Sequence, residues 1–427
     1  MSRSVIAAVP FAGGQHSPRT RRNALMVPQA SRLNNVRYDI RGPVLRRARQ
    51  LEAEGHRILK LNIGNTAPFG LMAPDSVVTE LVQNIGEAQG YSDARGIHSA
   101  RLAVSQYYTT LGVPDVGPDD VYLGNGVSEL IVMALQALLD PGDEVLVPSP
   151  DYPLWTGAVI LCGARAAHYR CDEQTGWQPD LDDVASKITE NTRALVIINP
   201  NNPTGAVYSR ETLLGLLDLA RRHGLLVLAD EIYDKILYDG AIHESTAALA
   251  PDLVVLTLSG LSKTYRAPGF RTGWLLVSGP RREAAGYLEG LELLANMRMC
   301  PNVPSQYAIQ AALGGPQSIT TLLQPGGRLR DQRDHAWQKL NEIPGVDCVK
   351  PQGALYVFPR LDPDVHKISD DQQLVIDLLE QQHLLLTHGT GFNLDTPDHL
   401  RMVFLAGIDV LDDAIGRLSS FLETYQQ

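Results

Sequence analysis

The sequence predicts an α/β fold, in which a mostly parallel sheet is flanked by helices and a smaller α+β domain follows. Three observations favour this fold class. Short runs of Val, Ile and Leu recur without polar alternation, as in strands that are covered on both faces. Helical patterns separate these runs, and strands separated by helices form parallel sheets through right-handed crossovers. The chain has 427 residues, of which 44% are hydrophobic, and this is enough for two domains.

The strands of the parallel sheet are expected as short apolar runs between residues 144 and 278. They cover 144–149, 193–199, 224–230, 253–259 and 273–278. Helical patterns occupy 127–139 and 211–223. In the second helix we expect one apolar face, with Gly224 as the stop signal. That face is formed by Leu213, Leu214, Leu217 and Ala220.

The pattern changes after about residue 300, where longer helices frame shorter strands. The helices are expected at 328–342, 370–382 and 409–423, and the strands at 346–350, 354–358 and 400–404. A run of helices and short strands without regular alternation is typical of an α+β domain. We therefore expect a second, smaller domain in the last third of the chain.

Composition excludes several classes of function. The net charge is −11, from 37 basic and 48 acidic side chains, which argues against binding to nucleic acid. No apolar run reaches the ~18 residues of a membrane span. The four cysteines form no CxxC pair, so we expect reduced thiols in the cytoplasm and no metal site. Residues 1–38 contain six arginines and no acidic residue, as in a cleaved targeting segment or a disordered tail.

Three loops at the ends of predicted helices and strands have compositions that core packing does not explain. In open α/β sheets, ligands bind outside the carboxyl ends of the strands. "GNGVSEL" (124–130) opens a helix whose first amides can bind an anion. "NPNNPTG" (199–205) is a rigid loop that holds Asn202, and "ADEIYDK" (229–235) places Asp230 at a strand end. The simpler interpretations are a turn, a connection and a helix N-cap.

A fourth segment, "SGLSKTYRAPGFRTGW" (259–274), carries Lys263 and Arg271. A lysine is most often a solvated surface charge. The alternative is a buried amine that forms a Schiff base with an aldehyde beside a fixed cation. Together the four segments offer an anion cradle, an amide, a carboxylate, a phenol, an amine and a guanidinium. Pyridoxal 5′-phosphate has groups that match this set, and neither a His/Cys metal cluster nor a Ser-His-Asp order competes with it.

With their spacing, these four segments resemble the class I/II aminotransferases, which are pyridoxal phosphate enzymes of fold type I. The resemblance runs from about residue 31 to the end of the chain. "YDIRGPV", "LKLNIGN", "DYPLW" and "INPNNPTGAVYS" are most similar to the bacterial glutamate–pyruvate (alanine) aminotransferases. We therefore expect a basic tail over 1–30, a small domain formed by 31–64 with 301–427, and a large cofactor-binding domain over 65–300.

The resemblance implies a role for individual residues. Lys263 matches the Schiff-base lysine that also transfers protons, Asp230 pairs with the pyridinium nitrogen, and Tyr233 assists at the ring oxygen. The wider cofactor site is expected to contain Gly126, Val127, Ser128, Tyr152, Asn202, Ser262 and Arg271. The substrate is expected to contact Gly64, Asn202 and Arg401, the last through a bidentate bond to its α-carboxylate. Tyr91 reaches the phosphate in the neighbouring subunit of a homodimer.

The activity that this resemblance implies is a ping-pong transamination of L-alanine and 2-oxoglutarate to pyruvate and L-glutamate. The alternatives are a branched-chain or aromatic aminotransferase or a β-lyase on the same fold. A non-catalytic regulator that binds the cofactor is a further alternative, but it needs a DNA-binding domain. Residues 1–38 are too rich in Pro and Gly to form one.

The sequence departs from the family pattern at Gly260, where many relatives carry a phosphate-binding serine. Ser262 is the expected substitute, and Gly260 and Leu261 are expected to bring the chain close to a ligand. Arg41 is either a contact for the distal carboxylate of glutamate or part of a surface salt bridge. Other titratable side chains are expected to be structural, among them His98, His168, His388 and His399.

Overall fold

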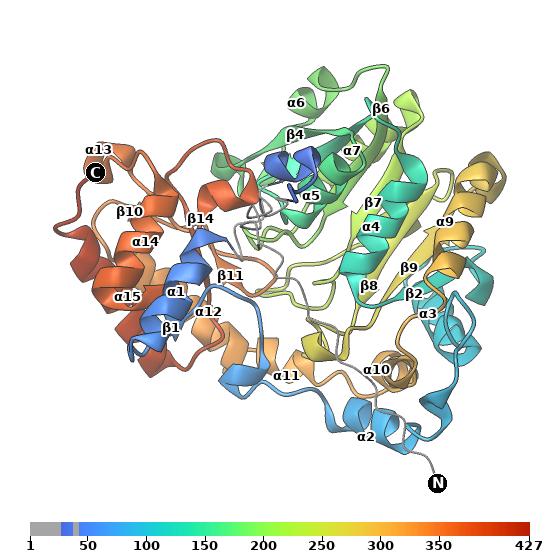
Figure 1. The fold of residues 1–427 in the computed structure, drawn as a ribbon, viewed down its shortest axis with the longest axis horizontal. Helices are drawn as coiled ribbons and strands as arrows, with labels where there is room; N and C mark the ends of the chain where they lie inside the picture. Colours follow the sequence, from blue (N-terminus) through green and yellow to red (C-terminus); the bar gives the residue numbers. More distant parts are fainter. Residues whose placement is uncertain (1–26, 37–41) are drawn as a thin grey trace, which may run out of the picture.

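The computed structural model describes residues 27–36 and 42–427. In these residues an eight-stranded mixed sheet forms the centre of the larger part of the molecule, and helices cover both of its faces (Figure 1). The strand order is β2-β9-β8-β7-β6-β3-β4-β5. The strands are β2 (Val121–Gly124), β3 (Glu144–Ser149), β4 (Arg165–Asp172), β5 (Gln178–Pro179), β6 (Thr192–Ile198), β7 (Leu226–Asp230), β8 (Val255–Gly260) and β9 (Gly273–Ser278).

The sheet is parallel from β8 through β7, β6 and β3 to β4. Strand β9 is antiparallel to both of its neighbours, β2 and β8, and β5 is antiparallel to β4. The α/β class with a mostly parallel sheet is therefore confirmed. The reversal at β9 was not predicted, because a strand buried on both faces has the same composition in either direction.

Both faces of the sheet are buried, as the unbroken apolar runs predicted. In β3, Val145 and Val147 pack against α4 (Val127–Leu138), α5 (Leu154–Leu161) and α9 (Ala285–Met297). Leu146 belongs to the opposite core, with α3 (His98–Thr110), α7 (Arg210–His223) and α10 (Ala308–Gly314). Successive side chains of a strand point to opposite faces. Strand β3 therefore contributes side chains to the hydrophobic cores on both sides of the sheet.

Helix α7 shows how local signals set the ends of an element. Ser209 caps its first turn by accepting a hydrogen bond from the Thr212 amide at 3.0 Å. Gly224 ends it with a φ of +64°, which costs a glycine little. The predicted apolar face was wrong at one position: Leu214 is 43% exposed, and Leu216 lies in the core in its place.

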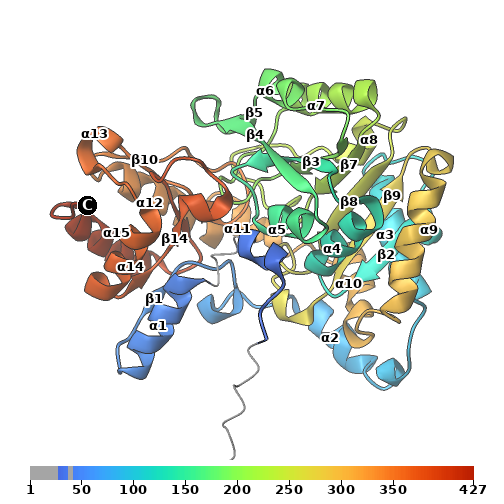
Figure 2. The ribbon, with the colours of Figure 1, turned by 45° about the horizontal axis from the view of Figure 1, so that its top comes forward.

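The smaller part of the molecule joins residues near the start of the described chain to its last third (Figure 2). Strand β1 (Leu59–Lys60) pairs in parallel with β13 (Leu384–Leu385). A single apolar core connects α1 (Pro43–Ala53) with the C-terminal helices. Those helices are α12 (Arg328–Asn341), α14 (Asp371–Gln382) and α15 (Ile408–Leu422). This packing favours the expected division into two domains, whose boundaries stay a prediction.

Short strands in this smaller part face the edge of the large sheet. Strands β11 (Tyr356–Val357) and β14 (Thr387–His388) pair on either side of β15 (Leu400–Val403). The predicted strand at 354–358 is shorter because Ala354 adopts a φ of +58°. Across from β15, strands β6, β7 and β8 end in register, with Ile198 opposite Asp230 and Asp230 opposite Leu258. The loops that follow these strands therefore meet at one edge.

No helix in the described ranges has the length and apolarity needed to cross a membrane. Arg41 and residues 1–26 lie outside the described residues, so the expectations for Arg41 and for the tail remain predictions.

Candidate active site

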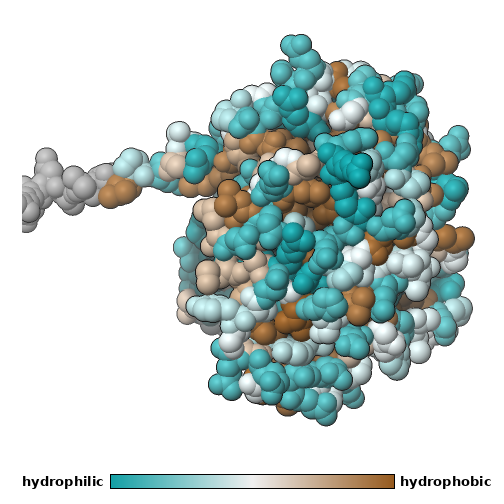
Figure 3. All heavy atoms as spheres, turned by 90° about the vertical axis from the view of Figure 1, so that its right-hand side faces the viewer, coloured by the Kyte–Doolittle hydropathy of each residue, from teal (hydrophilic) through white to brown (hydrophobic). Residues whose placement is uncertain are grey.

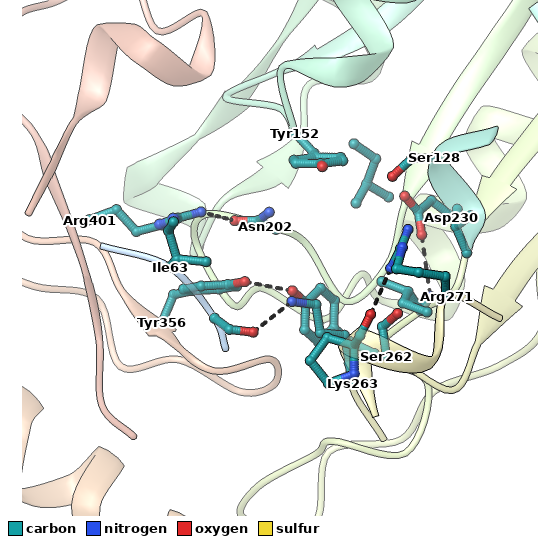
Figure 4. Close-up of a pocket in the computed structure, with 16 residues that line it drawn as sticks. Ile63, Ser128, Tyr152, Asn202, Asp230, Ser262, Lys263, Arg271, Tyr356 and Arg401 are labelled. Atoms are coloured by element: carbon teal, nitrogen blue, oxygen red, sulfur yellow. Dashed lines mark hydrogen bonds between the residues drawn. The ribbon is translucent and has the colours of Figure 1, made fainter. Parts of the chain in front are cut away.

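A cavity of about 190 Å³ lies between the carboxyl edge of the sheet and the strands of the smaller part (Figure 4). It contains all the predicted site residues except Gly126 and Tyr91. The predicted residues that line it are Gly64, Val127, Ser128, Tyr152, Asn202, Asp230, Tyr233, Ser262, Lys263, Arg271 and Arg401. The structure thus brings together side chains from segments more than 300 positions apart in the sequence.

Lys263 lies in the turn that follows β8, and its amine points into the cavity (Figure 4). The turn is closed by a hydrogen bond from the Arg266 amide to the Lys263 carbonyl at 3.0 Å. Lys263 Nζ donates to the Gly64 carbonyl at 2.9 Å. No carboxylate of the described residues lies within ion-pair distance of it. The amine is therefore placed for reaction with a ligand aldehyde, and it is not a solvated surface charge.

Asp230 ends β7 and is only 3% exposed. The Trp155 indole donates to its Oδ2 at 3.2 Å, and the Ile232 amide donates to its Oδ1 at 3.3 Å. Burial raises the pKa of Asp230 to about 6, although these two donors and Lys263 act in the opposite direction. A buried carboxylate without an ion-pair partner is stabilised by a bound cation. The protonated ring nitrogen of pyridoxal phosphate is a cation of this kind.

Two tyrosine side chains that line the cavity are in contact through their hydroxyls. Tyr233 and Tyr356 share a hydrogen bond of 2.7 Å between their hydroxyls, and both side chains are buried. Burial raises the pKa of Tyr233 well above its ordinary value, and the neighbouring Tyr356 phenol adds to this effect. Tyr233 therefore keeps its proton and is a hydrogen-bond donor to an anionic ligand oxygen.

Arg401 lies on β15 and is 2% exposed. Its Nη1 donates to Asn202 Oδ1 at 2.9 Å, and its Nη2 donates to the Asn62 carbonyl. Its guanidinium carbon lies 4.4 Å from the Tyr356 ring centroid and 4.5 Å from that of Phe392. The ring contacts fix the plane of the guanidinium, which suits it to a planar carboxylate.

The remaining wall of the cavity is an anion site. Val127 and Ser128 are the first residues of α4, whose N-terminus carries unpaired amides and a partial positive charge. Arg271 donates to the carbonyls of Pro268 and Asn125 at 2.9 and 3.1 Å. In the described residues no carboxylate forms an ion pair with Arg271. This cradle fits a phosphate group.

Gly126 is placed beside this cradle and does not line it. Its φ is +83°, and a side chain there would overlap the Arg271 guanidinium. Its role is to allow Arg271 to approach the start of α4. Tyr91 is 82% exposed and lies outside the cavity. The four histidines that were expected to be structural also lie outside the cavity; they are His98, His168, His388 and His399.

The expectation for Gly260 and Leu261 was wrong. A Cβ at Gly260 would lie 2.7 Å from the Thr272 carbonyl oxygen and 2.8 Å from the Gly273 Cα. The close approach is therefore to β9 and not to a ligand, and Leu261 lies in the core with no exposed surface. Gly260 is thus packed against β9, while Ser262 lines the cavity.

Five residues that line the cavity were not predicted from the sequence. They are Ile63, Ile198, Ile232, Pro268 and Tyr356. Tyr356 is the most consequential because it contacts both Tyr233 and Arg401. Within the sequence it is one apolar-strand residue among others, and 123 positions separate it from Tyr233. Only the folded arrangement shows that it belongs to the site.

The chain matches a known protein family over most of its length. Residues 56–416 match the family described as aminotransferase class I and II. An alanine aminotransferase of Mycobacterium tuberculosis is 62% identical over 400 residues, covering 93% of each chain. The glutamate-pyruvate aminotransferase AlaA of Escherichia coli K12 is 57% identical over 401 residues, covering 94% of this chain and 99% of the relative.

Solved structures have the same fold. A crystal structure of an aminotransferase from Escherichia coli superimposes with a TM-score of 0.93 at 56% identity, over 94% of this chain and all of the other. An alanine aminotransferase from Pyrococcus furiosus superimposes with a TM-score of 0.87 at 38% identity, over 93% of this chain and all of the other.

Proposed function

Since the chain belongs to the class I and II aminotransferases, which depend on pyridoxal 5′-phosphate, we propose that it exchanges an amino group between L-alanine and 2-oxoglutarate. The products are pyruvate and L-glutamate. One observation carries the proposal: the amine of Lys263, the carboxylate of Asp230 and the guanidinium of Arg401 face one cavity. The names of relatives that are 57–62% identical over nearly the whole chain support alanine and glutamate as the amino donors.

When bound, pyridoxal phosphate supplies an aldehyde and a ring that accepts electrons from the substrate α-carbon. Lys263 would hold the cofactor through its aldehyde group, and its amine, when free, would move a proton between the substrate Cα and the cofactor C4′. Asp230 keeps the proton on the ring nitrogen, because a buried carboxylate stabilises the adjacent N–H cation.

Other residues hold the cofactor in place. Tyr233 and Asn202 would bind the ring oxygen, and Tyr152 would contact the ring. Arg271, the amides of Val127 and Ser128 at the start of α4, and the Ser262 hydroxyl would bind the phosphate. These roles are supported by the positions of the residues around a single cavity.

Arg401 orients the substrate. A bidentate bond to the α-carboxylate leaves the amino group and the Cα–H bond directed toward Lys263. A side chain at position 64 would clash with Tyr356, since a Cβ there would lie 2.5 Å from the Tyr356 hydroxyl, and the glycine keeps this part of the cavity open to the substrate. All amino donors share the carboxylate, so this contact serves each of them equally.

A panel of amino acids with 2-oxoglutarate tests the proposal. We expect kcat/KM to be highest with L-alanine, and the reverse reaction to run with L-glutamate and pyruvate. The measurement is the rate of 2-oxo acid formation in a coupled assay. A preference for branched-chain or aromatic donors, or release of ammonia without a 2-oxo acid acceptor, would overturn the alanine assignment.

The same panel of amino acids tests the role of Arg401 through the Arg401→Lys variant. A lysine keeps the charge but loses the bidentate geometry, so KM should rise by about 10- to 100-fold for every donor alike. An increase limited to one donor would place the α-carboxylate elsewhere.

We also propose a cytoplasmic homodimer in which Tyr91 reaches the phosphate site of the other subunit. Tyr91 is 82% exposed, although it is a large aromatic residue. Exposed apolar side chains lie on α2 (Asp75–Gln83) and on α9, and the face in Figure 3 carries hydrophobic residues between hydrophilic ones. The described cysteines are free, which supports a reducing compartment.

Sedimentation should give twice the chain mass of 46.6 kDa. The Tyr91→Phe variant should stay dimeric and bind the cofactor about 5- to 10-fold more weakly, because one hydrogen bond to the phosphate is lost. A monomeric wild-type enzyme, or a variant with unchanged cofactor affinity, would contradict this arrangement.

A further inference from the structure

Tyr356 lies at the centre of the site without a role in the chemistry described above. Its hydroxyl is 2.7 Å from that of Tyr233, and its ring lies under the Arg401 guanidinium at 4.4 Å (Figure 4). A Cβ built on Gly64 would lie 2.5 Å from the Tyr356 hydroxyl and 3.3 Å from Lys263 Nζ. The Tyr356 hydroxyl and the Lys263 amine therefore approach the same point.

The geometry points to a directed hydrogen bond in which Tyr356 donates to Tyr233, so that Tyr233 is free to donate to the cofactor ring oxygen. In the state with a free Lys263 amine, the Tyr356 oxygen is also placed to accept from that amine. We assign Tyr356 as a positioning residue for both Lys263 and Tyr233. This inference rests on the proposed function only in requiring that Tyr233 faces the cofactor.

The direction of this hydrogen bond follows from the number of protons. Two hydroxyls that share one hydrogen bond cannot both donate to each other. If Tyr233 uses its proton for the ring oxygen, its own oxygen must accept from Tyr356. When the Lys263 amine is free of the cofactor, the Tyr356 oxygen can also accept from it, because the Gly64 carbonyl uses only one of the amine's N–H groups.

The electrostatics agree with this direction. Burial alone would raise the pKa of Tyr356, but the nearby Lys263 and Arg401 cations outweigh it and hold the pKa of the Tyr356 phenol below its ordinary value. Tyr233 is shifted in the opposite direction. A phenol beside two cations donates readily, which is consistent with Tyr356 as the donor in the 2.7 Å hydrogen bond. A hydroxyl whose oxygen accepts one hydrogen bond becomes a stronger donor in the next hydrogen bond.

The Tyr356 ring has a separate task. It supports one face of Arg401, while Phe392 supports the other at 4.5 Å. Removal of the hydroxyl and removal of the ring should therefore have different consequences. Tyr356→Phe removes only the hydrogen bonds of the hydroxyl, whereas Tyr356→Leu also removes the support of the carboxylate-binding guanidinium.

The test is a spectral titration of the cofactor-loaded enzyme without amino acid. A donor to the ring oxygen stabilises the deprotonated cofactor and lowers the pH midpoint of its visible absorption band. In Tyr356→Phe this donor is weaker, and we expect the midpoint to rise by about 0.5 to 1 pH unit. An unchanged midpoint would overturn the inference. Because no amino acid is present, this result is independent of which substrate the enzyme prefers.

A double-mutant cycle tests the hydrogen bond itself. Tyr233→Phe should raise the midpoint further than Tyr356→Phe does, and the double variant should match Tyr233→Phe alone. Additive shifts would show that Tyr356 does not act through Tyr233, and would overturn the inference.

Kinetics then separate the hydroxyl from the ring. In Tyr356→Phe we expect kcat to fall by about 5- to 10-fold with KM within twofold of wild type. In Tyr356→Leu, KM for the amino acid should rise as well. If Tyr356→Phe altered KM alone, the hydroxyl would be a substrate contact and the assignment would be wrong.

Discussion

Replacing Lys263 with alanine is expected to abolish transamination, lowering kcat by at least about 10⁴-fold. Lys263 is the only lysine among the residues that line the described cavity, and no histidine lines it. In the described structure no other side chain there can both hold the cofactor covalently and transfer the proton. The measurement is single-turnover transamination of L-alanine, because a slow half-reaction is still detected when steady-state turnover is lost.

Borohydride reduction of the wild-type enzyme, followed by peptide mass mapping, should place the pyridoxyl label on Lys263, and the variant should carry none. Lys187→Ala is the matched control, since Lys187 pairs with Asp183 at a partly exposed site outside the cavity. That variant should keep both the label and wild-type kcat. A label on another residue of the wild-type enzyme would remove Lys263 from the mechanism.

The elements of the large sheet could be predicted because each was specified locally. Strands β3 and β9 have the predicted bounds, 144–149 and 273–278. They are apolar on both faces, and turn residues end the run before each of them. Helix α7 begins and ends at residues with a clear capping role. Where the signal lies within a few neighbouring residues, the sequence is sufficient.

Features that depend on distant packing could not be predicted. Gly260 is small because β9 lies against β8, and nothing near position 260 shows this. Tyr356 belongs to the site because β11 faces the end of β7 across the cavity. Each of these is a tertiary relation between segments far apart in sequence. The error at Leu214 is of another kind, because the i, i+3, i+4, i+7 period from Leu213 already indicates Leu216 as the buried position.

The Asp230→Asn variant is expected to lower kcat by about 10²- to 10³-fold, because the buried charge that keeps the ring nitrogen protonated is lost. It should also change the pH dependence of stability in the cofactor-free protein. The folded-state pKa of Asp230 is raised by burial from 3.8 to about 6. The folded protein therefore binds this proton more tightly than the unfolded chain does, and stability falls as the pH rises from about 4 to 6. The loss is about 3 kcal/mol at neutral pH.

Cofactor binding should reverse this loss, since the ring cation then faces the ionised carboxylate. The stabilisation that pyridoxal phosphate gives should thus increase between pH 4 and 7 in the wild-type enzyme and stay nearly constant in Asp230→Asn. Thermal unfolding with and without cofactor across this range measures both effects. Burial also raises the pKa of Asp151, to about 7, but Asp151 is present in both proteins, so their difference isolates Asp230. An identical pH profile in the two proteins would mean that Asp230 does not pair with the ring nitrogen, and that the cofactor is held in another orientation.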